Sequence, residues 1–167
     1  GLAAAQGDAE AQATLGRMYH DGQGGPPDLS EAKRLYGLAA AQGHAESQVR
    51  LGCLHHLGQG GPPDYGEARR LFGLAAAQGH AVAQVTLGRM HYLGEGGPKD
   101  VAEARRLYGL AAAKGDAEAQ AGLGRMHYDG DGVPQDFAEA RRLYGLAAAQ
   151  GHALSLIHIS EPTRRSA

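Results

Sequence analysis

Histidine is the residue type in this sequence best suited to bind a metal. The chain has nine histidines among its 167 residues. Three of them, His55, His91 and His127, recur once every 36 residues. Neighbouring imidazoles at that spacing are not expected to converge within the ~2.1 Å of a metal–nitrogen bond. We therefore expect no metal site and no cofactor.

Cys53 is the only cysteine and the strongest candidate nucleophile. A single cysteine gives neither an intrachain disulfide nor a zinc site built on cysteines, and it fits an oxidising or a reducing compartment equally. His56 follows three residues later on the same side of a helix, but no acidic residue recurs beside the pair to orient the imidazole. A catalytic thiol is not favoured, and we expect no enzymatic activity.

Two glycine-rich loops resemble ligand-binding motifs but lack residues that those motifs need. The DGDG sequence at 129–132 resembles a calcium loop, yet Pro134 replaces the required glycine and Ala140 the bidentate glutamate. The GQGG sequence at 22–25 leaves a helix, whereas a phosphate-binding loop leads from a strand into one. Both loops are expected to be turns.

All of these residues belong to a repeat of 36 residues. The segment Gly37–Phe72 matches Gly73–Tyr108 at 25 of 36 positions, and Gly1–Tyr36 and Gly109–Tyr144 are further copies. A period of this length indicates a repeat architecture. Cut at the Gln-Gly-Asp/His turn, the array covers 1–151 with whole units at 8–43, 44–79, 80–115 and 116–151, while 1–7 end a preceding unit and 152–153 begin a truncated fifth. The chain starts inside a repeat without Met, so we expect a fragment of a longer protein.

Each unit carries two helical patterns. In the first unit, apolar or small residues between Asp8 and Gly22 recur at spacings of three, four and seven. The second pattern begins at Asp28, and Glu31 completes a capping-box signature, in which the aspartate accepts from a free backbone N–H and the glutamate reaches back. This pair recurs at 64/67, 100/103 and 136/139. We expect the second helices to end at Gly43, Gly79, Gly115 and Gly151.

Glycine also occurs inside both expected helices, where each glycine costs about 1 kcal/mol relative to alanine. One column is Gly16, Gly52, Gly88 and Gly124, and the other is Gly37, Gly73, Gly109 and Gly145. Recurrence predicts close helix-to-helix approach, with neutral drift in duplicated copies as the alternative for the second column. Because one unit cannot bury its apolar face alone, the units must stack. We predict an all-α, right-handed α/α solenoid of antiparallel helix pairs with a concave and a convex face.

The units share the motif A-x-x-x-L-G-x-x-Y/H-x-x-G-x-G, a loop ending in Asp, and then E-A-x-x-L-Y/F-x-x-A-A-x-Q/K-G. In the first unit this is Ala11, Leu15-Gly16, Tyr19, Gly22, Gly24, Asp28, Glu31-Ala32, Leu35-Tyr36, Ala39-Ala40 and Gln42-Gly43. Over 1–151 the sequence resembles the Sel1-like repeat, a relative of the tetratricopeptide repeat. It departs at Leu35 and its counterparts, where that family often has an aromatic residue. His55, His91 and His127 replace the family's tyrosine, and we expect them between helices. The resemblance implies a protein-interaction scaffold.

The resemblance also implies where a partner binds. In tetratricopeptide repeats the first helix of each pair lines the concave groove, which here places there Glu10, Arg17, His20, Glu46, Cys53, His56, Arg89, Tyr92, Glu118, Arg125 and Tyr128. Arginine binds carboxylates and tyrosine gives rigid contact area. The column Arg17, Arg89 and Arg125 could hold an acidic segment or a peptide carboxylate. The alternative is a solvated face of Glu–Arg pairs.

Charge gives little further indication of a partner. A net charge of −2 supplies no field for nucleic acid or an anionic membrane. No apolar run reaches the roughly 20 residues of a membrane helix. The second helices carry paired cations at 33–34, 69–70, 105–106 and 141–142, and each second cation lies three residues after the capping glutamate. This pattern predicts ion pairs on an outer surface, with a phosphate-binding stripe as the alternative.

The C-terminal segment abandons the repeat. Residues 154–164, LSLIHISEPTR, lie where a fifth unit would continue. The string resembles the conceptual translation of a sequencing adaptor, which makes 154–167 an artefact. The alternative is a genuine cap that covers the last helix pair.

We therefore predict a non-enzymatic scaffold or adaptor that binds a protein or peptide segment, possibly an acidic one, on the concave face. The alternative is the repeat segment of a larger enzyme or regulatory protein whose catalytic domain lies outside this sequence. Binding of a metal or small ligand by the histidine columns is a third hypothesis, which a zinc-dependent rise in melting temperature would support.

Overall fold

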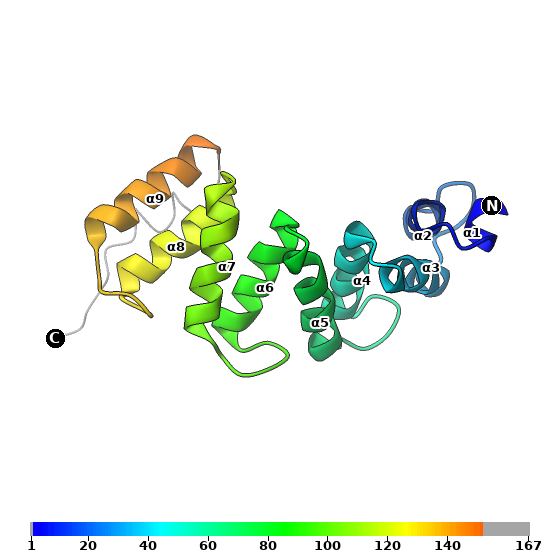
Figure 1. The fold of residues 1–167 in the computed structure, drawn as a ribbon, viewed down its shortest axis with the longest axis horizontal. Coiled ribbons are helices and arrows are strands. Elements are labelled where there is room, and N and C mark those ends of the chain that lie inside the picture. Colours follow the sequence, from blue (N-terminus) through cyan, green and yellow to red (C-terminus); the bar gives the residue numbers. More distant parts are fainter. Residues whose placement is uncertain (1, 152–167) are drawn as a thin grey trace.

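The computed structural model describes residues 2–151, which form helices and loops without a strand (Figure 1). The helices are α1 (Leu2–Ala5), α2 (Ala9–Asp21), α3 (Leu29–Ala41), α4 (Ala45–Leu57), α5 (Tyr65–Ala77), α6 (Ala81–Leu93), α7 (Val101–Ala113), α8 (Ala117–Asp129) and α9 (Phe137–Ala149). None of the described helices is long and apolar enough to cross a membrane. The 154–164 segment lies outside the described residues.

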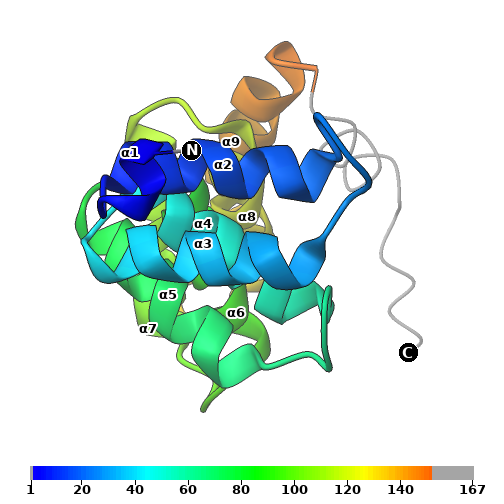
Figure 2. The same ribbon diagram turned by 90° about the vertical axis from the view of Figure 1, so that its right-hand side faces the viewer.

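The helices stack in chain order. Each packs against the next, α2 against α3, α3 against α4 and onward to α9, so the row runs from α1 at one end to α9 at the other (Figure 1). Viewed along the row, the pairs turn about its long axis (Figure 2). The predicted all-α solenoid of helix pairs is confirmed. We call α2, α4, α6 and α8 the first helices, and α3, α5, α7 and α9 the second helices.

The helices begin and end where the sequence predicted, and one predicted capping contact is wrong. Asp28 Oδ1 accepts from the Glu31 amide at 2.9 Å, and the same cap recurs in α5, α7 and α9. The glutamate does not reach back, because its carboxylate accepts from Arg34 and the Asp28 amide donates to the Tyr19 carbonyl. The expected glycine stops are confirmed: Gly43 lies just past α3 at φ 85°, in the left-handed region that favours glycine.

The two glycine columns have different environments. A Cβ added at Gly16 would lie 3.0 Å from the Tyr36 ring, and one at Gly52 would lie 3.1 Å from the Phe72 ring. The predicted close approach is therefore confirmed for the first helices, where an aromatic ring of the second helix packs on bare backbone. It is wrong for the second helices, because a Cβ at Gly37 or Gly73 meets nothing within 4 Å.

Buried glutamines join units to the unit that precedes them. Gln48 is 3% exposed, and its amide donates to the Ala40 carbonyl at the end of α3. Its carbonyl oxygen accepts from Gln78 at 2.8 Å, at the end of α5. Gln12, Gln84 and Gln120 are buried at the equivalent positions. Since a buried amide is costly unless it is hydrogen-bonded, this contact fixes how consecutive units stack.

Candidate functional site

The units differ from one another mainly in their first helices. Across the four units, nine of the thirteen positions vary in the first helices, from AEAQATLGRMYHD in α2 to AESQVRLGCLHHL in α4. Only four of thirteen vary in the second helices, all of which contain RLYGLAAA or RLFGLAAA. The exposed sides of α2, α4, α6 and α8 form what we call the first-helix face.

The first-helix face has an apolar centre and charged ends. Leu57 ends α4 and Leu93 ends α6, with 62% and 56% of each residue exposed, and Val82 is 52% exposed at the start of α6. At the positions of these leucines the outer units have Asp21 and Asp129. Leu57 and Val82 line the same hollow, and exposed apolar side chains that share a hollow are typical of a contact surface.

Two neighbouring hollows lie on this face. The larger, about 470 Å³, has apolar walls that include Cys53, Leu57 and Val82. The smaller, about 80 Å³, lies between α2 and α4 and is lined by Arg17 among other residues. Tyr36, Glu46 and Arg50 line both hollows and so form their shared wall.

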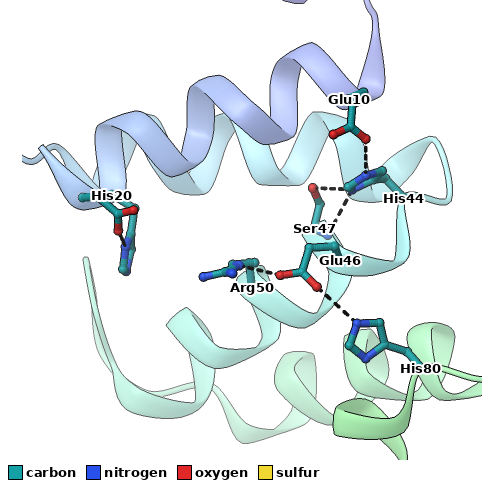
Figure 3. A network of polar contacts seen from close by, with 8 residues as sticks. Glu10, His20, His44, Glu46, Ser47, Arg50 and His80 are labelled. Atoms are coloured by element: carbon teal, nitrogen blue, oxygen red, sulfur yellow. Dashed lines mark hydrogen bonds and ion pairs between the residues drawn. The ribbon is translucent and has the colours of Figure 1, made fainter. Parts of the chain in front are cut away.

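Glutamates of the first-helix face bind histidines of the following unit (Figure 3). His44 caps α4 and donates from Nε2 to Glu10 at 3.1 Å, while its Nδ1 accepts from the Ser47 amide. His80, at the start of α6, donates to Glu46 at 3.2 Å. Burial raises the pKa of Glu46, but the bonds from Arg50 and His80 outweigh it and hold that pKa below its ordinary value. These two glutamates are thus already engaged within the chain.

The next unit boundary lacks this contact. Its first helices carry Val82 in place of the glutamate and Asp116 in place of the histidine. The glutamate and the histidine are therefore both present at the first two boundaries and both absent at the third. This pairing is a property of the interface between units, which a column-by-column inspection of the sequence does not reveal.

The three arginines of the predicted binding column differ in their partners. Arg89 donates to Glu118 and Arg125 to Asp129, each at 3.4 Å. Arg17 makes no hydrogen bond or ion pair with any of the residues 2–151. The two pairs fit the alternative of a solvated face, whereas Arg17 keeps its guanidinium available for a ligand.

The predicted histidines of this face contact nearby acidic groups. His20 donates to the neighbouring Asp21 at 2.8 Å. His56 donates to Glu95 in the next unit's loop at 2.9 Å, and its ring packs edge-on against Tyr65 at 5.2 Å. His20 lines the larger hollow, whereas His56 is directed to the loop.

The predicted tyrosines lie toward the C-terminal loops. Lys99 lies 4.9 Å from the centre of the Tyr92 ring, and burial together with a hydrogen bond to Asp131 raises the pKa of that tyrosine. Tyr128 packs edge-on against Phe137 at 5.3 Å. Tyr92 therefore contributes to a contact between units and Tyr128 to one within its own unit, and neither lines the two hollows.

Cys53 is half-buried in the wall of the larger hollow. Burial raises the pKa of its thiol, which lowers the fraction present as the nucleophilic thiolate. Among residues 2–151, no three His, Cys, Asp or Glu side chains converge as metal ligands would. The environment of Cys53 is that of a packing side chain that a ligand in the hollow would touch.

The outer ladder on the second helices forms the predicted ion pairs. Arg34, Arg70, Arg106 and Arg142 each donate two hydrogen bonds to the glutamate three residues before them. The preceding cation reaches the next unit: Arg69 donates to the Pro98 carbonyl at 3.2 Å and to His91 Nδ1 at 2.6 Å. This ladder therefore joins units as well as covering the outside.

The sequence reasoning missed several residues that line the hollows, among them Tyr36, Leu57 and Arg50. Tyr36 comes from a second helix, Leu57 ends its helix, and Arg50 lies in a column otherwise filled by Thr14, Thr86 and Gly122. Arg50 could have been found, because it follows Glu46 by four residues and so shares a helix face with it. Tyr36 could not, since its motif position indicates only a core aromatic.

Comparison with known proteins matches every unit of the array. The family model described as Sel1 repeat matches residues 9–44, 45–80, 81–116 and 117–152. No curated protein sequence matches the chain.

Three solved structures have similar folds. The first, c5321, is described as a protective antigen of uropathogenic Escherichia coli with an SLR fold (36% identity, TM-score 0.88, 93% of this chain and 33% of that one). The second is a Sel1 repeat protein from Oxalobacter formigenes (34% identity, TM-score 0.83, 92% of this chain and 61% of that one). The third is a putative sel1 repeat protein from Klebsiella pneumoniae (27% identity, TM-score 0.62, 87% of this chain and 70% of that one). The chain thus spans a third of the length of the first and less than two thirds of the second.

Proposed function

Because this chain belongs to the Sel1 repeat family, we propose that it is a non-enzymatic scaffold that binds a segment of a partner protein on the concave, first-helix face. Sel1 repeat proteins are commonly protein-interaction scaffolds, and their fold is generally non-catalytic. The observation that carries the proposal is the larger hollow, with Leu57 and Val82 exposed on its walls, beside the smaller hollow lined by charged groups. Apolar contact area supplies affinity, and charged groups around it set orientation.

The contrast between the two kinds of helix supports this choice of face. The second helices present nearly the same outer surface in every unit, whereas the first helices present a different one in each. A surface that differs from unit to unit can bind an extended partner with specificity for the order of its side chains. The array of stacked units supplies the length that such a partner needs.

The experiment that tests this proposal compares charge reversal on the two faces. Arg17, Arg89 and Arg125 are changed together to glutamate, and the control changes Arg34, Arg70 and Arg106. Each protein is probed with a random peptide library displayed on phage. We expect peptides selected on the unaltered protein to be lost by the first-face variant and kept by the control, with helicity unchanged in both. Peptides retained by the first-face variant would place the binding surface elsewhere.

The alternative, a repeat segment attached to a catalytic or regulatory domain, makes a different prediction. It expects the native gene to encode a non-repeat domain beside the array, whereas a pure scaffold expects further Sel1 units. Sequencing the native locus on both sides of this segment separates the two, and also decides whether 154–167 are encoded.

A further inference from the structure

The smaller hollow gathers hydrogen-bond donors that the chain itself does not fully use. Arg17 has no partner among residues 2–151. Arg50 uses only Nε, which donates to Glu46 at 2.7 Å, so both of its terminal nitrogens remain free to donate. The third donor is the hydroxyl of Tyr36, which is buried and has no hydrogen-bond partner within the described part of the chain. Three donors around one hollow indicate a site for an acceptor.

The Tyr36 hydroxyl is not explained by the fold. Tyr36 is 2% exposed, so its hydroxyl loses contact with water without gaining a partner, which costs stability. The equivalent residue of the next unit is Phe72, 1% exposed and packed on Gly52 as Tyr36 is on Gly16. The fold therefore accepts a phenyl ring at this position. Such a group calls for an explanation outside the packing of the fold, and a hydrogen bond to a ligand is one.

Both acidic side chains of this hollow are already hydrogen-bonded within the chain, whereas Arg17 is not paired with any of residues 2–151. Glu10 accepts from His44, and Glu46 accepts from both Arg50 and His80. In the same column as Arg17, Arg89 and Arg125 have acidic partners within the chain. The hollow therefore holds the one arginine of this column that has no acidic partner among residues 2–151.

We propose that the smaller hollow binds a carboxylate of the partner while the larger hollow receives an adjacent large apolar side chain. This inference rests on the proposed function and narrows the partner to a segment with an acidic residue beside an aliphatic or aromatic one. The volume of about 80 Å³ equals that of roughly three water molecules, which a carboxylate can displace. Arg50, whose side chain is 44% exposed on the shared wall, turns toward the carboxylate and opens the Tyr36 hydroxyl to it.

The second hollow supplies the apolar half of this recognition. Val82 and Leu57 are exposed on its walls, and Val49 and Leu54 are buried there. Because Tyr36, Glu46 and Arg50 line both hollows, a ligand that fills them needs its charged and apolar groups on neighbouring positions. A ligand with only the acidic group, or with only the apolar group, fills one of the two hollows.

The test uses peptides selected by phage display on the 167-residue protein. One selected peptide is synthesised with fluorescein, and its affinity is measured by anisotropy for the unaltered protein, Tyr36→Phe and Arg17→Gln. Tyr108→Phe, from another unit, and Arg106→Gln, from the outer ladder, are the matched controls. We expect the selected peptides to carry Asp or Glu next to Leu, Ile, Val, Phe or Met. Tyr36→Phe, Arg17→Gln and amidation of the peptide acid should each weaken binding roughly tenfold or more, while both controls bind as the unaltered protein does.

A double-mutant cycle tests whether the Tyr36 hydroxyl and the peptide acid contact each other. If the Tyr36 hydroxyl donates to the peptide acid, Tyr36→Phe should weaken the amidated peptide little further. Selected peptides that lack an acidic residue, or unchanged affinity of Tyr36→Phe with helicity retained, would overturn this inference and leave the proposed scaffold intact. Failure to select any peptide that competes for the first-helix face would overturn both.

Discussion

The first and second helices of each unit have the same length and opposite roles. Both are thirteen residues long in every unit. A second helix packs between two first helices, and its Ala68, Leu71 and Phe72 are at most 1% exposed. A first helix also packs between second helices, and both kinds keep an exposed side, which carries Leu57 and Val82 on first helices and Leu74 on a second helix. Because only the first helices differ strongly from unit to unit, the comparison supports the proposal that they carry recognition.

The glycines refine this comparison. Gly52 and Gly73 look alike in the sequence, since each recurs in every unit inside a helix. Only the first-helix column touches an aromatic ring. Recurrence therefore reflects packing only for the first-helix glycines. The second-helix glycines fit the alternative of neutral drift, in which each copy inherited them when the unit was duplicated.

The largest expected effect contrasts one leucine from each kind of helix. Leu71→Ala removes a side chain that is 1% exposed and should lower the free energy of unfolding by about 2–5 kcal/mol. Leu57→Ala removes one that is 62% exposed and should change it by less than about 0.5 kcal/mol. Urea unfolding followed by circular dichroism measures both. If both substitutions lowered the free energy of unfolding by similar amounts, the distinction between a structural second helix and an exposed first-helix surface would be wrong.

The two glycine columns should respond to alanine with opposite signs. Gly52→Ala places a Cβ 3.1 Å from the buried Phe72 ring, and the overpacking of about 1–3 kcal/mol exceeds the gain in helix propensity. Gly73→Ala meets open space and should raise the free energy of unfolding by about 1 kcal/mol. The same urea experiment reports both signs. A loss of stability in Gly73→Ala would show that the second column packs after all.

A smaller effect is expected from the contact between the two kinds of helix at His91. Burial, together with Arg69, lowers the pKa of His91 below the ordinary value of about 6.5. A lowered folded-state pKa means that the stability is complete above pH ~6.5 and is lost as the pH falls through the folded value. His91→Tyr, which copies Tyr19 of the first unit, should therefore lose less stability between neutral pH and pH ~5. Thermal melts across that range measure it, and identical pH profiles would contradict the assignment.

The smallest effect belongs to the outer ladder. Arg70 holds the pKa of Glu67 below its ordinary value through two hydrogen bonds, but the pair is exposed to solvent. Glu67→Gln should cost about 0.3–0.5 kcal/mol at low salt. High salt should remove most of that difference. A loss that persists at high salt would mean that the Glu67–Arg70 pair is stronger than a screened surface ion pair.

Much of the fold could be predicted from the sequence because its signals are local and repeated. Caps at Asp28 and stops at Gly43 depend on nearby residues, and four copies of each leave little room for another pattern. The glutamine bridge from Gln48 to Ala40 and Gln78 could not be predicted, because it depends on how units stack. The direction of the Glu31 side chain was predicted wrongly for a related reason: Arg34 competes for the same carboxylate.

The candidate site was predictable only in outline. The choice of the first helices followed from the family resemblance, and Arg17, Glu46 and Cys53 do line the hollows. The sequence did not indicate which arginine is left without a partner, because the ion pairs of Arg89 and Arg125 form only once the helices are in place. Nor did it separate Tyr36 from the other core aromatics, since only the structure shows its hydroxyl without a partner.

The central claim is that a partner binds on the first helices, and backbone amide NMR tests it most directly. A peptide selected on this protein is added to the ¹⁵N-labelled chain, and the amide shifts are followed along each helix. The account predicts shifts that concentrate in α2, α4 and α6, around Arg17, Arg50 and Cys53, with little change on the outer sides of α3, α5 and α7. Shifts concentrated on the second helices, around Gly73 and Leu74, would contradict it.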